Sequence, residues 1–401
     1  MKKYFGKLCM GGVFLFSLSM SLTSCEGALD DILGEWSRPT PGSSTGGAVT
    51  SIDLDADEMK LTVGDKGQLT AKVDPAGTAV TWSSDKEEIA TVEANGLVTA
   101  VAVGTAIITA KAGDKTATCK VTVLPTLSTP LTIEAITAGT IKVTSPQAGM
   151  QYSLNGGAKT AVTATPIDVA AGGKVAFYGN GTTIASYNGT QIVGGTADIK
   201  VYGNIMSLVD EENFATNYTT LPADYTFLDL FSGNAKLTDA SGLLLPATTL
   251  KKNCYDRMFR GCTSLTTAPA ELPATDLTGA NGCYGGMFLG CTILTTAPEL
   301  KATTLASGCY GSMFAGCEAL TTAPELKAET LKDNCYQYMF KDCYSLSSVT
   351  CLATNLTASN CTYDWLINVA ASGTFTKASG ADWSGKTGFS GIPSGWTVIE
   401  Q

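Results

Sequence analysis

The chain has 401 residues, contains no histidine, and carries 36 acidic against 26 basic residues, which gives a net charge of −10 at pH 7. The lack of histidine excludes Ser-His-Asp and Cys-His nucleophilic sites and every zinc site that uses histidine. The acidic balance disfavours nucleic acid as a partner, and charged residues make up only 15% of the chain, below the share in typical soluble domains.

The amino terminus predicts export. Lys2 and Lys3 precede an apolar run over residues 8–22, which ends in Leu22-Thr23-Ser24-Cys25. A basic start, a short apolar core and a small-residue cleavage site are typical of a secretory signal. The ending resembles the bacterial lipobox, in which the cysteine is acylated; the alternative is an ordinary signal peptide with an incidental cysteine. The resemblance implies a lipoprotein signal peptide over residues 1–24 and a lipid on Cys25 that anchors the chain to a membrane.

Residues 25–47 predict a flexible tether, because they are rich in Pro, Gly and Ser and cannot form a core. Glu26, Asp30 and Asp31 follow the cysteine. In lipoproteins of gut Bacteroides-type bacteria, such acids accompany export to the outer face, so the resemblance implies an outer membrane lipoprotein exposed at the cell surface. Without residues 1–24, 23 basic residues face 36 acidic ones, a net charge of −13 that suits a solvated surface protein.

Residues 48–124 alternate apolar and polar side chains as half-buried strands do. Asp74-Pro75-Ala76-Gly77 and Asn95-Gly96 supply turns between these runs, and the spacing predicts a small β-sandwich. The segment resembles the group 2 bacterial immunoglobulin-like domain through the motifs Val80-Thr81-Trp82-Ser83-Ser84, Ile89-Ala90-Thr91-Val92 and Gly96-Leu97-Val98-Thr99-Ala100. The resemblance implies a spacer or adhesion module on a surface protein.

Residues 128–205 also predict strands. Hairpin signals stand at Asn155-Gly156-Gly157, Gly172-Gly173 and Gly179-Asn180-Gly181. We expect a second small all-β module here. It has no glycine-rich phosphate loop, no clustered acids and no metal-ligand spacing.

From about residue 230 the chain repeats itself. The motif Cys254-Tyr255-Asp256-Arg257-Met258-Phe259-Arg260-Gly261-Cys262 returns from Cys283, Cys309 and Cys335, at intervals of 29, 26 and 26 residues. A degenerate copy starts at Cys361, and upstream Leu230-Phe231-Ser232-Gly233-Asn234 matches the register with Asn in place of Cys. A Leu-Thr-Thr-Ala-Pro-Glu-Leu segment lies between copies, over residues 294–300 and 320–326.

The spacing inside one copy predicts a short helical turn. Cys254 and Met258 are four residues apart, as are Tyr255 and Phe259, so a helix would place all four on one face. No copy could bury its apolar face alone, so we expect the copies to stack as a solenoid over residues 206–369, with residues 370–401 as a carboxy-terminal cap. The phenylalanines at one position should then touch their copies above and below; these are Phe259, Phe288, Phe314 and Phe340.

The repeats resemble the BspA-type leucine-rich repeat over roughly residues 225–365. The shared pattern is Ala/Met-Phe-x-Gly-Cys-x-x-Leu-Thr, and the departures are the extra cysteine at the start of each copy and the Ala-Pro-Glu-Leu segment. The resemblance implies a one-helix, one-strand solenoid and a tendency to bind host or matrix proteins. The expected fold class is therefore multidomain and mostly β: an Ig-like β-sandwich, a second small all-β module, then a one-helix/one-strand leucine-rich-repeat-like solenoid.

Ten cysteines fall in the repeats, and three interpretations stay open for them. They could form a ladder of buried free thiols, since free cysteine is among the most buried side chains. They could form disulfides, because the compartment is extracytoplasmic. Zinc is disfavoured, because the eight-residue spacing is wider than structural zinc sites use.

Asp53, Asp55 and Asp57 lack the Gly and Glu positions of a calcium loop, so we interpret them as the outer face of an edge strand.

Polar residues recur at the repeat period in the extended segments and predict a ligand face, since solenoids bind partners through a repeated face. The alternative is that a threonine ladder is simply favourable surface β chemistry. The candidate ligand residues are Thr267, Thr296, Glu299, Thr322 and Glu325.

The resulting hypothesis is a lipid-anchored cell-surface protein that binds a macromolecule, either a host or matrix protein or a glycan, through its solenoid, in adhesion. The alternative is a non-binding structural spacer or assembly component. A carboxylate-type glycosidase is disfavoured, because no pair of acids stands out from the repeat pattern. We expect no enzymatic activity, no cofactor and no bound metal. Exposed aromatic side chains on a repeat face would favour binding, and a uniform Thr/Ala face would favour a spacer.

Overall fold

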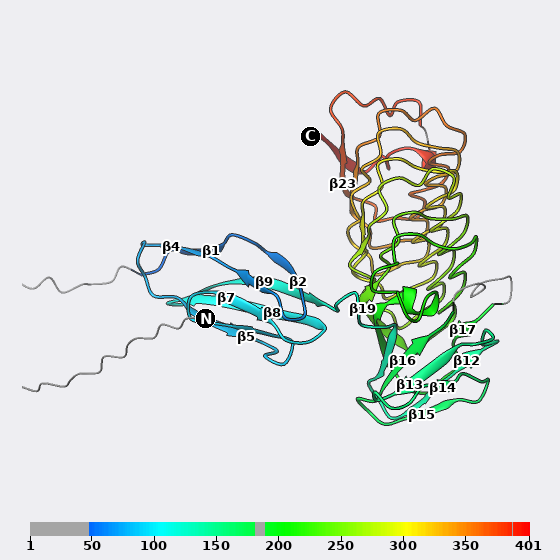
Figure 1. The fold of residues 1–401 in the computed structure, drawn as a ribbon. Coiled ribbons are helices and arrows are strands. Elements are labelled where there is room, and N and C mark those ends of the chain that lie inside the picture. Colours follow the sequence, from blue (N-terminus) through cyan, green and yellow to red (C-terminus); the bar gives the residue numbers. More distant parts are fainter. Residues whose placement is uncertain (1–47, 181–188, 387) are drawn as a thin grey trace, which may run out of the picture. The chain divides into compact units, whose positions relative to one another are not determined.

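A computed structural model describes residues 48–180, 189–386 and 388–401 (Figure 1). The predicted signal peptide over residues 1–24, the tether over residues 25–47 and the lipidation site Cys25 lie outside the described residues. The described residues form strands, turns and two short 3-10 helices, η1 (Ile205–Leu208) and η2 (Gly388–Ser390). The mostly β, multidomain character expected from the sequence is confirmed.

The first domain is an antiparallel sandwich with one parallel strand pair. Its strands are β1 (Ser51–Leu54), β2 (Glu58–Thr62), β3 (Lys66–Gln68), β4 (Ala71–Asp74), β5 (Thr81–Ser84), β6 (Ala90–Val92), β7 (Leu97–Ala100), β8 (Gly104–Ala112) and β9 (Lys115–Leu124). One sheet has the order β2-β9-β8-β5 and a second has the order β3-β7-β6, while β1 and β4 pair separately. Only β2 and β9 run parallel in these sheets. The predicted Ig-like sandwich is confirmed.

Alternating side chains of these strands form the core of the sandwich, as the period of two predicts. In β8, Ala106, Ile108 and Ala110 are fully buried, and in β9 the buried side chains include Cys119 and Val121. The turn glycine of Asn95-Gly96 adopts φ +83°, a conformation that glycine enters without steric cost. Residues 48–124 therefore fold around two hydrophobic clusters of their own.

The second β region begins a sheet that the repeats continue. Its strands are β10 (Thr132–Ala135), β11 (Gly139–Ile141), β12 (Val143–Thr144), β13 (Gln151–Leu154), β14 (Thr160–Ala161), β15 (Ile167–Val169), β16 (Lys174–Tyr178), β17 (Gln191–Ile192) and β18 (Ile199–Asn204). The main sheet has the order β14-β13-β16-β10-β18-β19, in which only the last pair is parallel. The change to parallel pairing at β19 (Leu237–Leu244) starts the stacking of the repeats.

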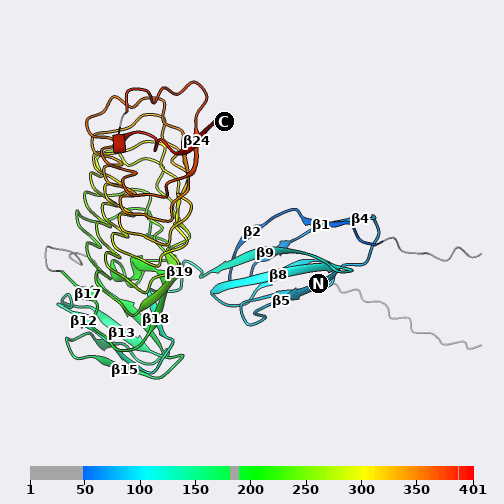
Figure 2. The same cartoon turned by 180° about the vertical axis from the view of Figure 1, so that it is seen from behind.

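This region and the repeats share one hydrophobic core, which runs from Leu131 to Trp396. The boundary predicted after residue 205 therefore falls inside a shared sheet and a shared core. Physically, residues 128–205 cover the first repeat and bury its open end, as a terminal cap of a solenoid must. Figure 2 shows this region continuous with the stacked turns.

The repeats stack in parallel with very short strands. After β19 these are β20 (Glu271–Leu272), β21 (Glu299–Leu300), β22 (Ser348–Cys351), β23 (Gly373–Lys377) and β24 (Trp396–Glu400). β20 pairs with β21, and β22, β23 and β24 pair in that order, all in parallel. Isolated parallel bridges such as Thr267 to Thr296 join the remaining layers. The predicted stacking of repeats is present.

The predicted one-helix, one-strand leucine-rich-repeat-like solenoid is wrong, because the described residues contain no α-helix. Residues 254–262 form consecutive turns in which hydrogen bonds alternate. The Met258 amide donates to the Tyr255 carbonyl in its own turn at 3.3 Å, whereas the Tyr255 amide donates to Cys283 in the next repeat at 2.9 Å. Asn253 and Arg257 have positive φ of 49° and 55°, and such residues interrupt a right-handed helix.

The error has a physical origin in the spacing. Positive φ recurs at every fourth residue of a turn, here at Asn253, Arg257 and Gly261. A four-residue period returns side chains to the same side almost as the 3.6-residue period of a helix does. Cys254, Tyr255, Met258 and Phe259 are therefore all buried, as predicted, although no helix places them there.

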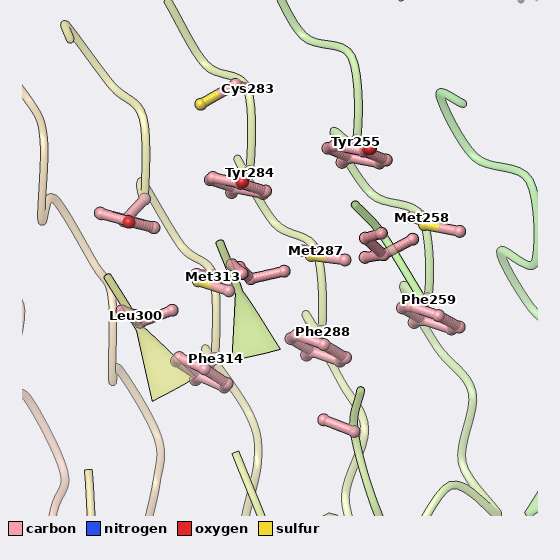
Figure 3. Close-up of a cluster of buried hydrophobic side chains, with 14 of the residues drawn as sticks. Tyr255, Met258, Phe259, Cys283, Tyr284, Met287, Phe288, Leu300, Met313 and Phe314 are labelled. Atoms are coloured by element: carbon pink, nitrogen blue, oxygen red, sulfur yellow. The ribbon is translucent and has the colours of Figure 1, made fainter. Parts of the chain in front are cut away.

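Aromatic rings form two columns through the repeats (Figure 3). Phe259 stacks on Phe288 at 5.3 Å between ring centroids, and Phe288 stacks on Phe314 at 5.5 Å. A parallel column contains Tyr255, Tyr284, Tyr310 and Tyr336. The prediction that the repeated phenylalanines touch their copies is confirmed. These rings are fully buried, so each repeat derives much of its buried apolar area from its neighbours.

One side chain closes both columns at the carboxy-terminal end. The Trp365 indole stacks on Tyr336 at 6.1 Å and lies at 54° against Phe340 at 6.5 Å. Trp383, from the segment predicted as a cap, stacks on Trp365 at 5.5 Å. A single large ring thus replaces a Tyr and a Phe and ends the regular stack.

The cysteines form a ladder of buried thiols. All eleven cysteines of the described residues are free and buried. The second cysteine of each pair donates from Sγ to a phenylalanine carbonyl of the preceding repeat, as Cys291 does to Phe259 at 3.1 Å and Cys317 does to Phe288 at 3.2 Å. Burial raises the pKa of the Cys291 thiol to about 12, which keeps it protonated and unreactive. Of the three interpretations, the free-thiol ladder is the one confirmed.

Candidate ligand-binding surfaces

Each repeat presents two outward surfaces that could meet a ligand. The strand face comprises the outward side chains of residues 266–271, 295–299 and 321–325. The turn face comprises the outward side chains between the two cysteines of each copy and their equivalents in the last turns. The buried columns hold both surfaces in register from one repeat to the next.

The structure places the predicted ligand residues in successive layers of the strand face. Thr267 and Thr296 are direct partners in a parallel bridge. Thr322 lies in the next repeat, where it pairs with Ser348. Glu299 pairs in register with Glu271, and Glu325 is its counterpart one repeat later. The predicted row therefore follows the direction of stacking.

Lysines neutralise the glutamates of this row. Lys327 donates to Glu299 Oε1 at 2.9 Å and lies 3.9 Å from Glu325, while Lys301 is ion-paired with Glu271. The hydrogen bond from Lys327 holds the pKa of Glu299 below its usual range, and the bond to Glu271 raises the pKa of Lys301. These contacts join adjacent repeats, so the strand face already satisfies much of its own charge.

The strongly exposed aromatic side chains lie elsewhere. Among the described residues they are Tyr344, Tyr363 and Phe389, exposed by 55%, 42% and 57%. None of them belongs to the strand face as defined above. All three lie in the last repeats and the segment that follows, where the sequence departs most from the repeat pattern.

Tyr338, Tyr363 and Phe389 form an aromatic row on the turn face. The Tyr338 and Tyr363 rings meet edge to face at 5.4 Å, and the Lys341 ammonium lies 5.5 Å from the Tyr338 ring centre. Phe389 follows Tyr363 by 26 residues, the repeat interval. We call these three side chains the aromatic row.

Hydrogen bonds fix the segment of Phe389 beside Tyr363. The Thr362 hydroxyl donates to the Ser390 carbonyl at 2.8 Å, and the Asp364 amide donates to Ser390 Oγ at 3.2 Å. Ser390 adjoins Phe389 in the chain, while Thr362 and Asp364 flank Tyr363. The three aromatic residues therefore stand in consecutive layers.

A cavity of about 500 Å³ opens beside Phe389. Its lining exposes polar and apolar surface in nearly equal parts; Leu366 and Ile392 are among the apolar side chains, and Asn368 and Ser394 are polar. The Asn368 amide donates to Asp342 Oδ1 at 2.6 Å, which fixes its orientation. Small-ligand sites combine apolar side chains with a few fixed polar groups, and both kinds are present here.

Sequence reasoning missed the aromatic row because it searched for side chains that recur. The positions equivalent to Tyr363 hold Asp256, Gly285, Gly311 and Gln337, so no aromatic pattern repeats there. A tyrosine that interrupts an otherwise small or polar column was the available signal. Departures from a repeat consensus on an outward position indicate a local role, because the fold does not require them.

An acidic cluster lies on the turn face of the first full repeat. Arg257 lies 3.4 Å from Asp229 and 3.6 Å from Asp256. Burial raises the pKa of Asp256 to about 6, against the opposing attraction of Arg257. The described residues contain no group of three or more acidic or cysteine side chains with the geometry of a metal site. Asp53, Asp55 and Asp57 are all exposed; Asp53 lies within β1, and the other two follow that strand.

Residues 48–180, 189–386 and 388–401 contain no helix with the length and apolarity that a membrane crossing needs.

Some comparisons with known proteins concern parts of the chain. Lacto-N-biosidase of Bifidobacterium bifidum is 43% identical over 83 residues, which cover 20% of this chain and only 8% of that enzyme. The chain thus spans less than a tenth of the length of this curated relative.

Two solved structures of the S-layer protein SbsC also match. Domains 4 and 5 of SbsC give a TM-score of 0.17 at 28% identity, covering 19% of this chain and 52% of that one. Domains 1–6 give a TM-score of 0.18 at 17% identity, covering 37% and 25%. The family model of the bacterial Ig-like domain (Big-like) matches residues 78–124, which include β5 to β9 of the sandwich. This segment is therefore a bacterial Ig-like domain.

Proposed function

We propose that the chain is a lipid-anchored protein of the outer membrane, exposed at the cell surface, that binds a macromolecular ligand through its solenoid in adhesion. The observation that carries the binding role is the aromatic row beside a cavity. Exposed aromatic rings contribute nothing to the two buried columns, and exposed aromatic surface beside a concave site is typical of binding surfaces. No enzymatic role is proposed.

The scaffold supports this role. The buried ladders fix the position of each outward side chain, and a rigid scaffold lowers the entropy lost when a ligand binds. The Ig-like domain, with its own core, would serve as a spacer between the anchor and the solenoid. The strand face, by contrast, favours the alternative of a structural spacer, because its carboxylates are paired with lysines of neighbouring repeats.

The anchoring part of the proposal rests on the sequence around Cys25. Cys25→Ser should release the protein from the membrane fraction, because the acyl chains would be lost. Fractionation of cells that express either form checks this. A Ser variant that still pellets with membranes after a salt wash would contradict the lipoprotein assignment.

The binding part is tested by probing the purified full chain against immobilised glycans and matrix proteins. We expect saturable binding to a member of one class. Ala substitutions at Thr267, Thr296 and Thr322 test the strand face, and substitutions in the aromatic row test the turn face. Lack of binding to every probe would favour the spacer.

A further inference from the structure

We infer that the aromatic row and the adjoining cavity bind a neutral glycan chain that runs along the direction of repeat stacking. This inference rests on the proposed binding function and assigns its surface and its ligand class. The three rings occupy consecutive layers of the turn face, so they offer a line of apolar surfaces instead of a single pocket. A chain of sugar units, each with an apolar C–H face, matches such a line.

Layer spacing supports an elongated ligand. Core rings of adjacent layers are 5.6 Å apart between Phe314 and Phe340 and 6.1 Å apart between Tyr336 and Trp365. The outward rings of Tyr338 and Tyr363 follow one another at a similar interval, with 5.4 Å between their centroids, and Phe389 belongs to the next layer. Tyr338 contacts Tyr363 edge to face, which leaves ring surface accessible on the 42% exposed Tyr363.

Polar groups beside the rings could satisfy sugar hydroxyls. Lys341 offers a donor at the Tyr338 ring, while the fixed pair of Asn368 and Asp342 offers both a donor and an acceptor. Asn368 also lines the cavity beside Phe389. Aromatic surface interleaved with fixed donors and acceptors satisfies both the apolar faces and the hydroxyls of a carbohydrate.

The charge of the chain favours a neutral glycan over an acidic one. Beyond residue 24, acidic residues outnumber basic ones by 13, so a polyanion would meet net repulsion. Near the row, Lys341 stands with the carboxylates Asp342 and Asp364. These neighbours therefore do not form a cluster of cations that would attract sulfate or uronate groups.

The surface suits a glycan better than a protein partner. Protein interfaces concentrate their energy in a fully desolvated centre that a surrounding rim shields from water. The aromatic row is one side chain wide, and polar side chains lie beside it. A narrow ligand can therefore cover the rings alone, whereas a broad protein surface would bury the polar groups as well.

The test uses the purified full chain and soluble polysaccharides in affinity electrophoresis, followed by titration calorimetry. Neutral probes are laminarin, xylan, galactomannan, amylopectin and desialylated mucin; acidic probes are heparin and polygalacturonate; protein probes are collagen and fibronectin. The test variant is Tyr363→Ala with Phe389→Ala. The matched control is Tyr344→Ala, which removes an exposed ring outside the row, and Tyr363→Phe keeps the stacking surface. Thermal melting checks that each variant folds.

We expect at least one neutral polysaccharide to bind, with affinity reduced by roughly tenfold or more in the double variant and changed by less than about twofold in Tyr344→Ala and Tyr363→Phe. Failure of all neutral probes, or undiminished binding by the double variant, overturns the inference. If collagen, fibronectin or an acidic probe binds instead, the inference fails while the proposed binding function stands. If no probe binds, both fail.

Discussion

The Ig-like sandwich and the repeat solenoid are both β structures, but they bury their cores in different ways. In the sandwich, strands that are distant in sequence contribute varied side chains, such as Leu69, Val98 and Ile108, to one closed cluster. In the solenoid, the same residue type returns at the same place, and its main contact is its own copy one layer away. The sandwich is therefore a closed unit, whereas each repeat depends on its neighbours.

This difference changes how damage should spread. A cavity in the sandwich weakens one cooperative domain. A cavity in the middle of the solenoid removes contacts from the layers on both sides, so it should uncouple the stack. The two regions have separate hydrophobic clusters, which allows their unfolding to be compared within one chain.

The largest expected effect is that of Phe314→Ala. Truncating this fully buried ring should cost about 3–5 kcal/mol, because burial is lost and a cavity remains between Phe288 and Phe340. Calorimetric melting should show the solenoid transition at lower temperature and that of the sandwich unchanged. Ile108→Ala is the matched change in the sandwich, and it should lower the melting temperature of the sandwich while leaving that of the solenoid unchanged.

A second control compares position along the stack. Phe231→Ala, in the degenerate first copy, should cost less than Phe314→Ala, because Phe231 stacks on one ring, Phe259, instead of two. Thiol labelling in increasing urea offers an independent readout, since Cys119 reports on the sandwich and the other described cysteines report on the solenoid. An equal shift of both transitions by Phe314→Ala would contradict the division into two cores.

The next effect depends on pH. Burial raises the pKa of Asp256 from 3.8 to about 6, so the folded state binds the proton more tightly than the unfolded state. The contribution of Asp256 to the free energy of unfolding is therefore most favourable below pH 3.8, and it falls as the pH rises to about 6. Asp256→Asn should stabilise the solenoid by about 1–2 kcal/mol at pH 8, after allowance for solvent screening, and by almost nothing at low pH.

Urea denaturation at several pH values measures this dependence. Asp276→Asn is the control of opposite sign, because hydrogen bonds from Thr278 lower the pKa of that exposed carboxyl. If the free energy of unfolding depends on pH in the same way for the parent protein and for Asp256→Asn, then Asp256 is not desolvated in solution.

An effect of similar size tests the left-handed turn residues of the solenoid. Gly290 has φ +74°, and a Cβ there would meet nothing nearer than 3.9 Å, so only backbone strain opposes a side chain. Gly290→Ala should cost about 1–2 kcal/mol. Gly311 lies in the same kind of turn without a positive φ, and Gly311→Ala should be nearly neutral in the same melting experiment. Equal costs for the two changes would contradict the turn geometry.

The smallest effect concerns the strand face. Lys327→Met removes the ion pair with Glu299, and partly exposed pairs contribute about 0.2–1 kcal/mol, less at high salt. Because the pKa of Glu299 is lowered, its contribution is present at neutral pH and is lost as pH falls through the carboxylate range. Lys332→Met, at an exposed lysine with no ion pair to the described residues, is the control. If high salt does not reduce the loss of stability caused by Lys327→Met, the loss does not have an electrostatic origin.

The sequence predicted the sandwich because its alternation and turn motifs, such as Asn95-Gly96, are local. It predicted the stacked phenylalanines because, in a stack of repeats, each copy has only the copies above and below as partners. It did not predict the turn conformation, since Cys254 and Met258 are four residues apart both in a helix and in a run of turns with positive φ at every fourth residue.

The candidate surfaces divide in the same way. The residues of the row that includes Thr267, Thr296 and Glu299 lie in successive layers, and their role as a ligand face stays a prediction. The ion pairs of this row depend on lysine contacts between repeats, which periodicity does not specify. The aromatic row was missed, because Tyr363 and Phe389 become neighbours only when the degenerate last turns are aligned with the regular ones. Its role in binding stays a prediction.

The indole of Trp365 also limits how this protein can change its length. One ring covers both the tyrosine and the phenylalanine column, and Trp383 in turn stacks on that ring, so the two columns do not continue as separate Tyr and Phe positions beyond it. At the other end, Asn234 donates to the Ile192 carbonyl, which ties the first copy to the preceding β region. Gene duplications that lengthen the solenoid are therefore expected to insert whole copies between Phe231 and Trp365. Such insertions would move the aromatic row farther from the amino-terminal end of the stack while leaving its own three layers intact.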